Sequence, residues 1–149
     1  MIRVHRAEEP GHAHRDMETL SRVLAAVIAQ QDSAGTVPAI RRRQARRYFA
    51  LLASRGRRDE SLQVGEDVTL WLAYIDPGEV RAVPLRSGRR AWIYTVRGSI
   101  SVNGSRLAEG DGASASDEKT LTLLGQHQAE ILLLDSPGQH WPVIEVLYE

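Results

Sequence analysis

The sequence predicts a mainly β protein, an antiparallel sandwich or jelly-roll barrel, with a short helical extension at its N-terminus. From Ser61 onward, short runs rich in Val, Ile, Leu and Thr alternate with turn signals, and no helical pattern separates them. Before Arg58 the apolar residues instead recur with the helical period. With 149 residues and 42% hydrophobic content, the chain can form one compact domain and a small appendage.

The composition excludes several classes of function. The chain contains no cysteine, so disulfides, thiolate ligands and a nucleophilic thiol are ruled out, and His, Asp and Glu remain as metal ligands. The longest apolar runs are far shorter than the ~20 residues that span a bilayer, and the polar start lacks a signal-peptide core. We therefore expect a cytoplasmic protein without membrane contact.

The N-terminal extension is predicted to contain two helices. In the first, residues 16–31, Asp16 is a suitable N-cap and Gly35 lies beyond the end. Its apolar residues follow the 3.6 period and are Leu20, Val23, Leu24, Val27 and Ile28. The second helix runs from Pro38, at an N1-like position, to Ser54. A strand remains the alternative for its last part, "RYFALLAS".

The net charge of zero hides a split between the two parts of the chain. Residues 1–58 contain 12 Arg against 5 Asp and Glu, whereas residues 59–149 contain 7 basic and 14 acidic residues. Either the two parts complement each other or are simply solvated, or the basic part meets an acidic partner. The run "RRRQARR", residues 41–47, could track nucleic-acid phosphates. The neutral overall charge and the lack of a base-reading motif favour a solvated helix face, so nucleic acid is not the expected partner.

Six strands are predicted in the second part, at residues 61–64, 67–75, 79–85, 90–104, 120–125 and 129–135. Within the fourth strand, alternation puts Trp92, Tyr94 and Val96 on one face and Ile93 on the other, which is typical of one buried face. The segment "GDGASASD", residues 110–117, is rich in glycine and is predicted to be a barrel turn.

The tail "HWPVIEVLYE", residues 140–149, alternates like one more strand. A single barrel leaves sheet edges that need cover. We therefore expect the tail to pair with its own barrel or with a second copy of the chain in a homodimer.

The glycines of the second part resemble the framework of the cupin motifs, G-x5-H-x-H-x3,4-E-x6-G and G-x5-P-x-G-x2-H-x3-N. Counted from Gly98 and Gly104, the metal-ligand positions of these motifs hold Pro84, Arg86, Ala91 and Ala115, and Lys119 stands at the asparagine. Proline and alanine cannot coordinate a metal and arginine stays protonated. The resemblance therefore implies a single cupin-type jelly-roll barrel without a metal inside.

Residues 49–137 are similar to the C-terminal cupin of pirin-like proteins, a two-cupin family that includes bacterial quercetin 2,3-dioxygenases. In that family the second cupin normally lacks metal. The start "MIRVHRAEEPGHA" looks like a pirin N-terminus, and His12, His14 and Glu18 fall on the first metal motif of the N-terminal cupin. If these three hold a cofactor, the resemblance implies a divalent transition metal such as Fe, Cu, Ni or Mn. The family's later segment, with a third histidine, is absent.

These observations divide the chain into a basic remnant of the first cupin at residues 1–48, a barrel at residues 49–137 and a tail at residues 138–149. The expected role is a non-catalytic module that binds a small molecule or a protein. The alternative is a metal-dependent dioxygenase similar to the quercetinases. Trp71, Trp92, Tyr94 and Arg86 are candidates to line a pocket for a flat aromatic ligand, although aromatic residues more often pack a core.

Overall fold

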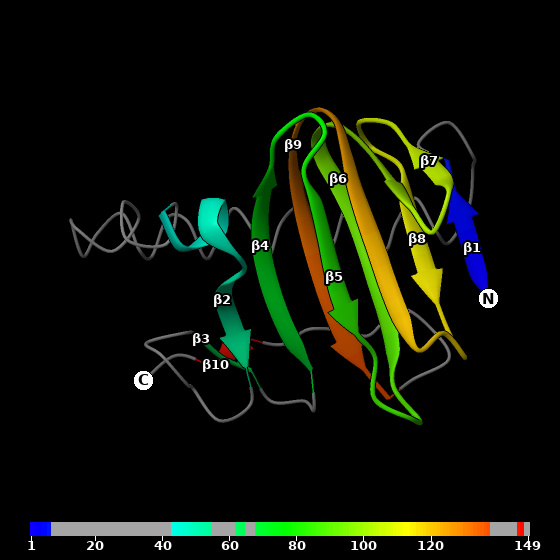
Figure 1. The fold of residues 1–149 in the computed structure, drawn as a ribbon. Coiled ribbons are helices and arrows are strands. Elements are labelled where there is room, and N and C mark those ends of the chain that lie inside the picture. The colour runs from blue at the N-terminus through cyan, green and yellow to red at the C-terminus, as the bar shows by residue number, and fades with distance from the viewer. Residues whose placement is uncertain (7–42, 55–61, 65–67, 138–145, 148–149) are drawn as a thin grey trace.

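The computed structural model describes residues 1–6, 43–54, 62–64, 68–137 and 146–147. Within these ranges the chain forms ten strands joined in one sheet (Figure 1). They are β1 (Ile2–His5), β2 (Ala50–Ser54), β3 (Leu62–Val64), β4 (Thr69–Ile75), β5 (Val80–Pro84), β6 (Arg90–Val102), β7 (Ser105–Leu107), β8 (Gly112–Ala115), β9 (Thr120–Ser136) and β10 (Val146–Leu147). The predicted fold class, mainly β with little helix, is confirmed.

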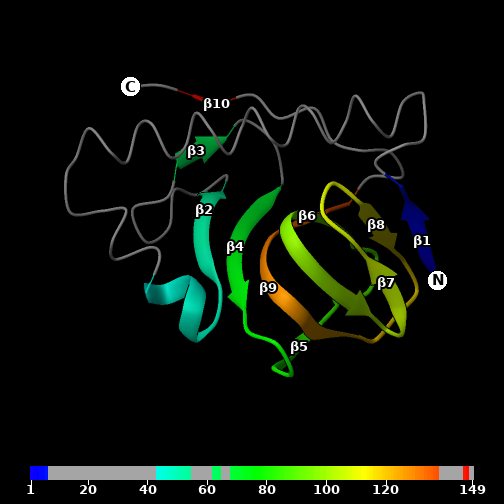
Figure 2. The ribbon, with the colours of Figure 1, turned by 90° about the horizontal axis from the view of Figure 1, so that it is seen from above.

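The long strands β6 and β9 form the centre of the sheet. The order is β1-β8-β6-β9-β4-β2-β3-β10, with β5 added to β9 and β7 added to β6. The pairs are antiparallel except for β2 with β3. Because β9 pairs with β5 along its first residues and with β4 along its last ones, it joins both sides of a curled sheet. Figure 2 shows this curl from above, with β4, β9, β6 and β8 around a common interior.

The interior of the curled sheet is filled with aliphatic side chains. One face of β4, β6 and β9 supplies Ala73, Ile75, Ile93, Ile131 and Leu133, all of them buried. Burial of this kind stabilises a fold by about 25 cal/mol for each Å² of apolar surface removed from water. The interior of the barrel is therefore a packed core along most of its length.

The opposite face of the same three strands is also apolar. Leu70 and Leu72 of β4, Trp92 of β6 and Leu132 of β9 form a second buried cluster, against which Tyr94 and Val96 pack. The expectation of one buried face for β6 is therefore wrong, because Trp92 and Ile93 are adjacent in the sequence and both are buried. A strand covered on both faces carries consecutive apolar residues, and "AEILLLD" in β9 has this pattern.

The predicted helix at residues 38–54 is correct only in part. Residues 43–47 are helical, but residues 50–54 form β2, which pairs with β4 and adds Ala50 and Leu52 to the second cluster. The alternative of a strand was thus the correct one for these residues. The predicted first helix, residues 16–31, lies outside the described residues.

The predicted turn at residues 110–117 is wrong for its central part. Gly112–Ala115 form the buried strand β8, which lies between β6 and β1. Its residues are glycine, alanine and serine, and all four positions are buried. Sheet membership also extends beyond residues 49–137, because β1 belongs to the N-terminal segment and β10, which pairs with β3, belongs to the tail. In the described ranges, no helix has the length and apolar character needed to cross a bilayer.

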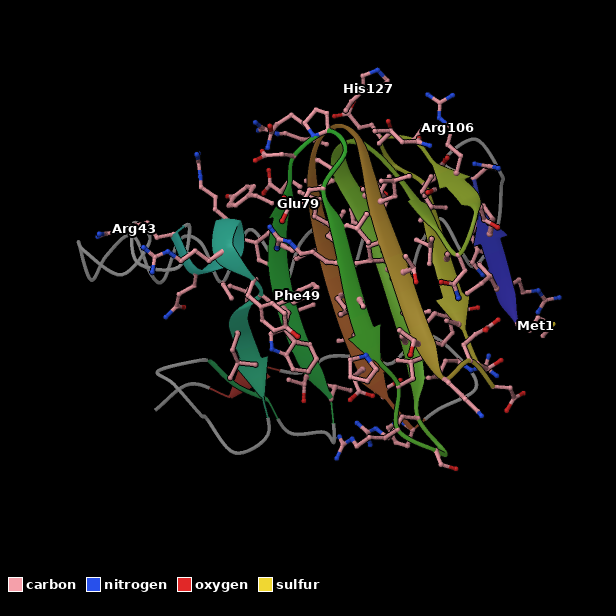
Figure 3. The ribbon with its side chains drawn as sticks, viewed as in Figure 1. Met1, Arg43, Phe49, Glu79, Arg106 and His127 are labelled. Atoms are coloured by element: carbon pink, nitrogen blue, oxygen red, sulfur yellow. The ribbon has the colours of Figure 1, made fainter. Side chains whose placement is uncertain are left out.

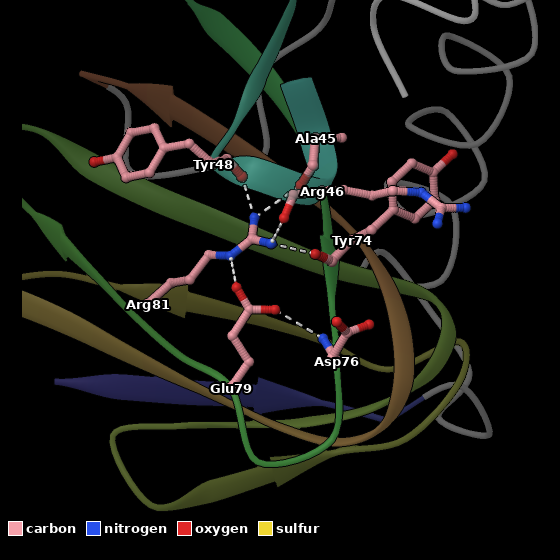
Figure 4. A network of polar contacts seen from close by, with 7 residues as sticks. All are labelled: Ala45, Arg46, Tyr48, Tyr74, Asp76, Glu79 and Arg81. Carbon is pink, nitrogen blue, oxygen red and sulfur yellow. Dashed lines mark hydrogen bonds and ion pairs between the residues drawn. The ribbon is translucent and has the colours of Figure 1, made fainter. Parts of the chain in front are cut away.

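A buried arginine joins the short helix to the barrel (Figure 4). Arg81 of β5 donates hydrogen bonds through Nη1 to the carbonyl oxygens of Ala45, at 2.8 Å, and Tyr48. Its Nη2 donates to the carbonyls of Arg46, at 2.8 Å, and Tyr74. Carbonyl groups at a helix C-terminus lack partners inside the helix, so this guanidinium satisfies them and places a positive charge at the favourable end of the helix.

Candidate functional site

The cupin ligand positions gather at one end of the barrel, the lower end in Figure 1. Pro84 ends β5, Arg86 follows in the turn to β6, and Ala91 of β6 pairs with Ala115 of β8. Both alanines are buried and belong to the aliphatic interior. These residues do not fit a metal ion, because none of them offers a neutral imidazole or a carboxylate. Among the described residues, no three His, Cys, Asp or Glu side chains lie close enough together to hold one.

A guanidinium lies where these motifs carry a ligand for a metal cation. Arg86 contacts Asp135 of β9, with 3.4 Å between Nη2 and Oδ2, and Arg89 donates to the same carboxylate from Nε to Oδ1 at 2.9 Å. Asp135 is the register partner of Ala91. The Asp135 carboxylate beside these positions is therefore already paired with two arginines, and positive charge at this end repels a divalent cation.

A small apolar cavity of about 60 Å³ opens beside these ion pairs. Trp71, Val83, Pro84, Leu85, Ala91 and Leu133 line it together with Arg86 and Asp135. Of the four residues predicted to form a ligand pocket, Trp71 and Arg86 meet here. Trp92 and Tyr94 lie on the other face of the sheet, in the second apolar cluster, and Trp92 donates from Nε1 to Ser136 Oγ at 3.0 Å.

A larger groove of about 490 Å³ continues from this cavity between two turns. The turn from β5 to β6 forms one wall and the turn from β8 to β9 forms the other. The lining residues are Leu85, Arg86, Ser87, Gly88, Arg89, Arg90, Ser116, Asp117, Glu118, Lys119 and Pro137. Its volume lies within the range of small-molecule sites, about 300–1,000 Å³. Four cationic side chains line the groove with two carboxylates, and Asp135 pairs with two of the cations, so one positive charge remains in balance. We call it the mouth groove.

Sequence reasoning identified Arg86 but missed the other cations of the mouth groove. Arg89 and Arg90 belong to the segment "SGRR", which has the composition of a turn, and Lys119 stands at the asparagine position of the motif. The register of β5 with β9, in which Pro84 is opposite Thr120, brings the two turns together. The sequence contains a partial signal for this, because the cupin spacing that points to Arg86 also points to Lys119.

The predicted metal ligands His12, His14 and Glu18 lie outside the described residues. His127 lies at the end of the barrel remote from the mouth groove, at the top of Figure 3. Its Nδ1 is 2.7 Å from Ser99 Oγ. The contact links β6 to β9. Because Ser99 is buried, its hydroxyl is not available to solvent as a nucleophile.

Comparison with known proteins agrees with this fold. The profile of the family described as the quercetinase C-terminal cupin domain matches residues 51–136. A quercetin 2,3-dioxygenase from Escherichia coli strain K12 is 28% identical over 173 residues, which cover 85% of this chain and 75% of the relative. Since this alignment is longer than the 149-residue chain, the relative contains residues inside it that this chain lacks.

Solved structures resemble the same region. The crystal structure of YhhW from Escherichia coli superposes with a TM-score of 0.60 at 30% identity and covers 62% of this chain and 40% of that one. A structure of the bacterial pirin YhhW in complex with nickel(II), also from Escherichia coli, gives a TM-score of 0.57 at 31% identity and covers 58% and 38%. The chain thus spans about two fifths of the length of these solved proteins.

Proposed function

Because the chain belongs to the family of the quercetinase C-terminal cupin domain, we propose that it is a non-catalytic module that binds a small molecule at the open end of its barrel. One observation carries the proposal: the ligand positions of the barrel hold Pro84, Arg86, Ala91 and Ala115, and Arg86 is paired with Asp135. A quercetinase needs a redox-capable metal with open coordination positions, and these side chains supply no ligand for one.

The second candidate function is a metal-dependent quercetin 2,3-dioxygenase. It is supported by the similarity of this chain to the Escherichia coli quercetin 2,3-dioxygenase and to the pirin that was solved in complex with nickel(II). In this chain, the reaction would depend on His12, His14 and Glu18, since Pro84, Arg86, Ala91 and Ala115 at the ligand positions of the barrel cannot hold a metal. Two imidazoles and one carboxylate are a small ligand set, and losing one of them would leave too little to retain the ion.

Metal content and quercetin turnover test the proposal together. The protein is incubated with nickel(II), iron(II), copper(II) or manganese(II), dialysed, and then assayed for bound metal and for oxygen uptake with quercetin. We expect less than about a tenth of an equivalent of metal and no turnover above the blank. The Escherichia coli dioxygenase named above, treated in parallel, serves as the positive control. Turnover that His14→Ala abolishes would establish the dioxygenase instead.

A further inference from the structure

We propose that the mouth groove binds a small carboxylate that carries a short apolar group, with the carboxylate held between Arg86 and Lys119 and the apolar group in the cavity beside Trp71. This inference rests on the proposed function, because it names the ligand class of that site. The two parts of the expected ligand follow from two adjoining parts of the surface, the mouth groove and the small cavity, which share Leu85 and Arg86.

The charge of the mouth groove selects an anion. Arg86 and Lys119 stand on opposite walls, and both are exposed. The backbone hydrogen bond from Leu85 N to Lys119 O, at 2.9 Å, holds the two walls together next to these side chains. A guanidinium offers two parallel N–H donors to a carboxylate, and an ammonium adds a point charge from the other side.

The remaining cations are held in place by protein groups and shape the site. Arg89 is fixed on Asp135, and the Arg90 guanidinium lies 5.7 Å from the centre of the Trp92 ring. Because their positions are set before a ligand arrives, the entropy cost of ordering them on binding is reduced. Arg86 holds Asp135 only at 3.4 Å, so it can turn toward a ligand while Arg89 keeps the Asp135 carboxylate paired.

The cavity beside Trp71 selects the other part of the ligand. Six of its eight lining residues are apolar, and Arg86 stands at its edge. A short aliphatic chain that leaves water for this cavity gains about 0.8 kcal/mol for each buried CH₂ group. The carboxylates of Asp117 and Glu118 lie in the lining of the groove and oppose ligands with several negative charges. A monoanion with a small apolar end therefore fits better than a polyphosphate.

Titration of the whole chain with butyrate, followed by ¹H–¹⁵N NMR, tests this inference. At constant ionic strength, we expect saturating shifts for backbone amides of residues 85–90 and 116–119 and for the Trp71 indole. Butyramide has the same shape without the charge, and inorganic phosphate has charge without an apolar group, so each should bind at least about ten-fold more weakly. The double variant Arg86→Gln with Lys119→Gln should weaken butyrate binding by a similar factor.

The matched control is Arg97→Gln. The Arg97 and Arg86 side chains are equally exposed, at 77%, but Arg97 faces Glu130 and does not line the groove. This variant should bind butyrate within about two-fold of the parent. Equal binding of butyramide, equal binding of phosphate, or unchanged binding by the double variant would each overturn the inference.

The two proposals fail separately. If butyrate does not bind and quercetin turnover stays at the blank, the proposed ligand class is wrong. The proposal that the protein is not a dioxygenase is then unaffected. If the protein turns over quercetin in the metal assay, the proposed function is wrong whatever butyrate does.

Discussion

Arg81 shows how much one side chain organises around itself. A guanidinium has five N–H donors, and here five acceptors meet them: four backbone carbonyls and Glu79 Oε2, which Nε reaches at 2.7 Å. The centre of the Phe49 ring lies 5.7 Å from the guanidinium carbon. The side chain is only 4% exposed, and a charge buried to this extent is tolerated when its hydrogen bonds are complete.

Replacing Arg81 with lysine should therefore be costly. An ammonium has three donors, so at least two of the five acceptors lose their partner. Each unpaired buried acceptor costs about 1–3 kcal/mol, and we expect Arg81→Lys to lower the free energy of unfolding by about 3 kcal/mol in urea denaturation. The control Arg97→Lys, at an exposed ion pair, should change it by less than about 0.5 kcal/mol. Equal losses for the two variants would mean that the network at Arg81 contributes nothing.

Glu79, which accepts a hydrogen bond from Arg81, makes part of the free energy of unfolding depend on pH. The hydrogen bond from Arg81 lowers the pKa of Glu79 below its usual value, and the backbone N–H of Asp76 acts in the same direction. A carboxyl group whose pKa is lower in the folded state stabilises the fold above its unfolded pKa, and this contribution is lost as the pH falls through the folded value.

The comparison of the parent with Glu79→Gln isolates this contribution. The difference in unfolding free energy between them should be full at pH 6 to 7 and should shrink as the pH falls below about 4. Urea denaturation across this range measures it, with Glu109→Gln at an exposed site as the control for general acid effects. A difference that stays constant down to pH 3 would rule out the proposed linkage.

The pattern of β5 explains why sequence reasoning missed Arg81. In "VRAVP" the apolar Val80 is exposed and the charged Arg81 is buried. Hydrophobic alternation predicts the reverse, because it depends on side-chain polarity alone. It takes no account of the backbone carbonyl groups of Ala45, Arg46 and Tyr48, which need a hydrogen-bond donor. Only the packing of the short helix against β5 reveals them.

At the scale of the elements, Gly98 allows the close pairing of β6 with β9. The pairing of the two strands shifts register across this residue, because β9 advances three residues, from Glu130 to His127, while β6 advances two, from Arg97 to Ser99. Gly98 has φ +74°, and a Cβ atom at this position would lie 2.0 Å from the carbonyl oxygen of Gln128. The glycine that marks the end of the first cupin motif is therefore required by a close approach of two backbones.

A comparison of Gly98 with Gly78, which has a similar φ, distinguishes the cost of the steric clash from the cost of backbone strain. Gly78 has φ +82°, but a Cβ atom there meets nothing within 4 Å. Gly78→Ala should cost about 1 kcal/mol from strain alone, whereas Gly98→Ala should cost about 3 kcal/mol or more because the strands must also separate. Thermal and urea unfolding of both variants measure the two costs. A smaller loss at Gly98 than at Gly78 would show that β6 and β9 adjust without penalty.

The error at residues 50–54 has a physical cause at this same scale. "ALLAS" contains good helix formers, so its local preference is helical. Pairing with β4 satisfies its backbone and buries Ala50 and Leu52, and tertiary contacts of this kind override a weak local preference. The same reasoning applies to β8, whose small residues resemble a turn in isolation.

For the whole molecule, the sequence was most informative where a pattern repeats. Regular strand spacing predicted the β fold, and the cupin glycine spacing located the end of the barrel where Pro84, Arg86 and Ala91 lie. The mouth groove could not be predicted in the same way, because Arg89, Lys119 and Asp135 come from three separate segments that only the strand register brings together. Likewise, nothing in the sequence of β6 tells which of its two apolar faces, with Trp92 or with Ile93, encloses the barrel interior.

The pairing of β1 with β8 has a consequence for synthesis on the ribosome. Ile2 is the register partner of Ala115, so β1 is translated more than a hundred residues before its partner strand exists. Contacts this far apart in sequence form slowly, and until they form both strand edges stay open to other chains. During translation β1 therefore stays unpaired, and this end of the sheet is completed only after β8 has emerged.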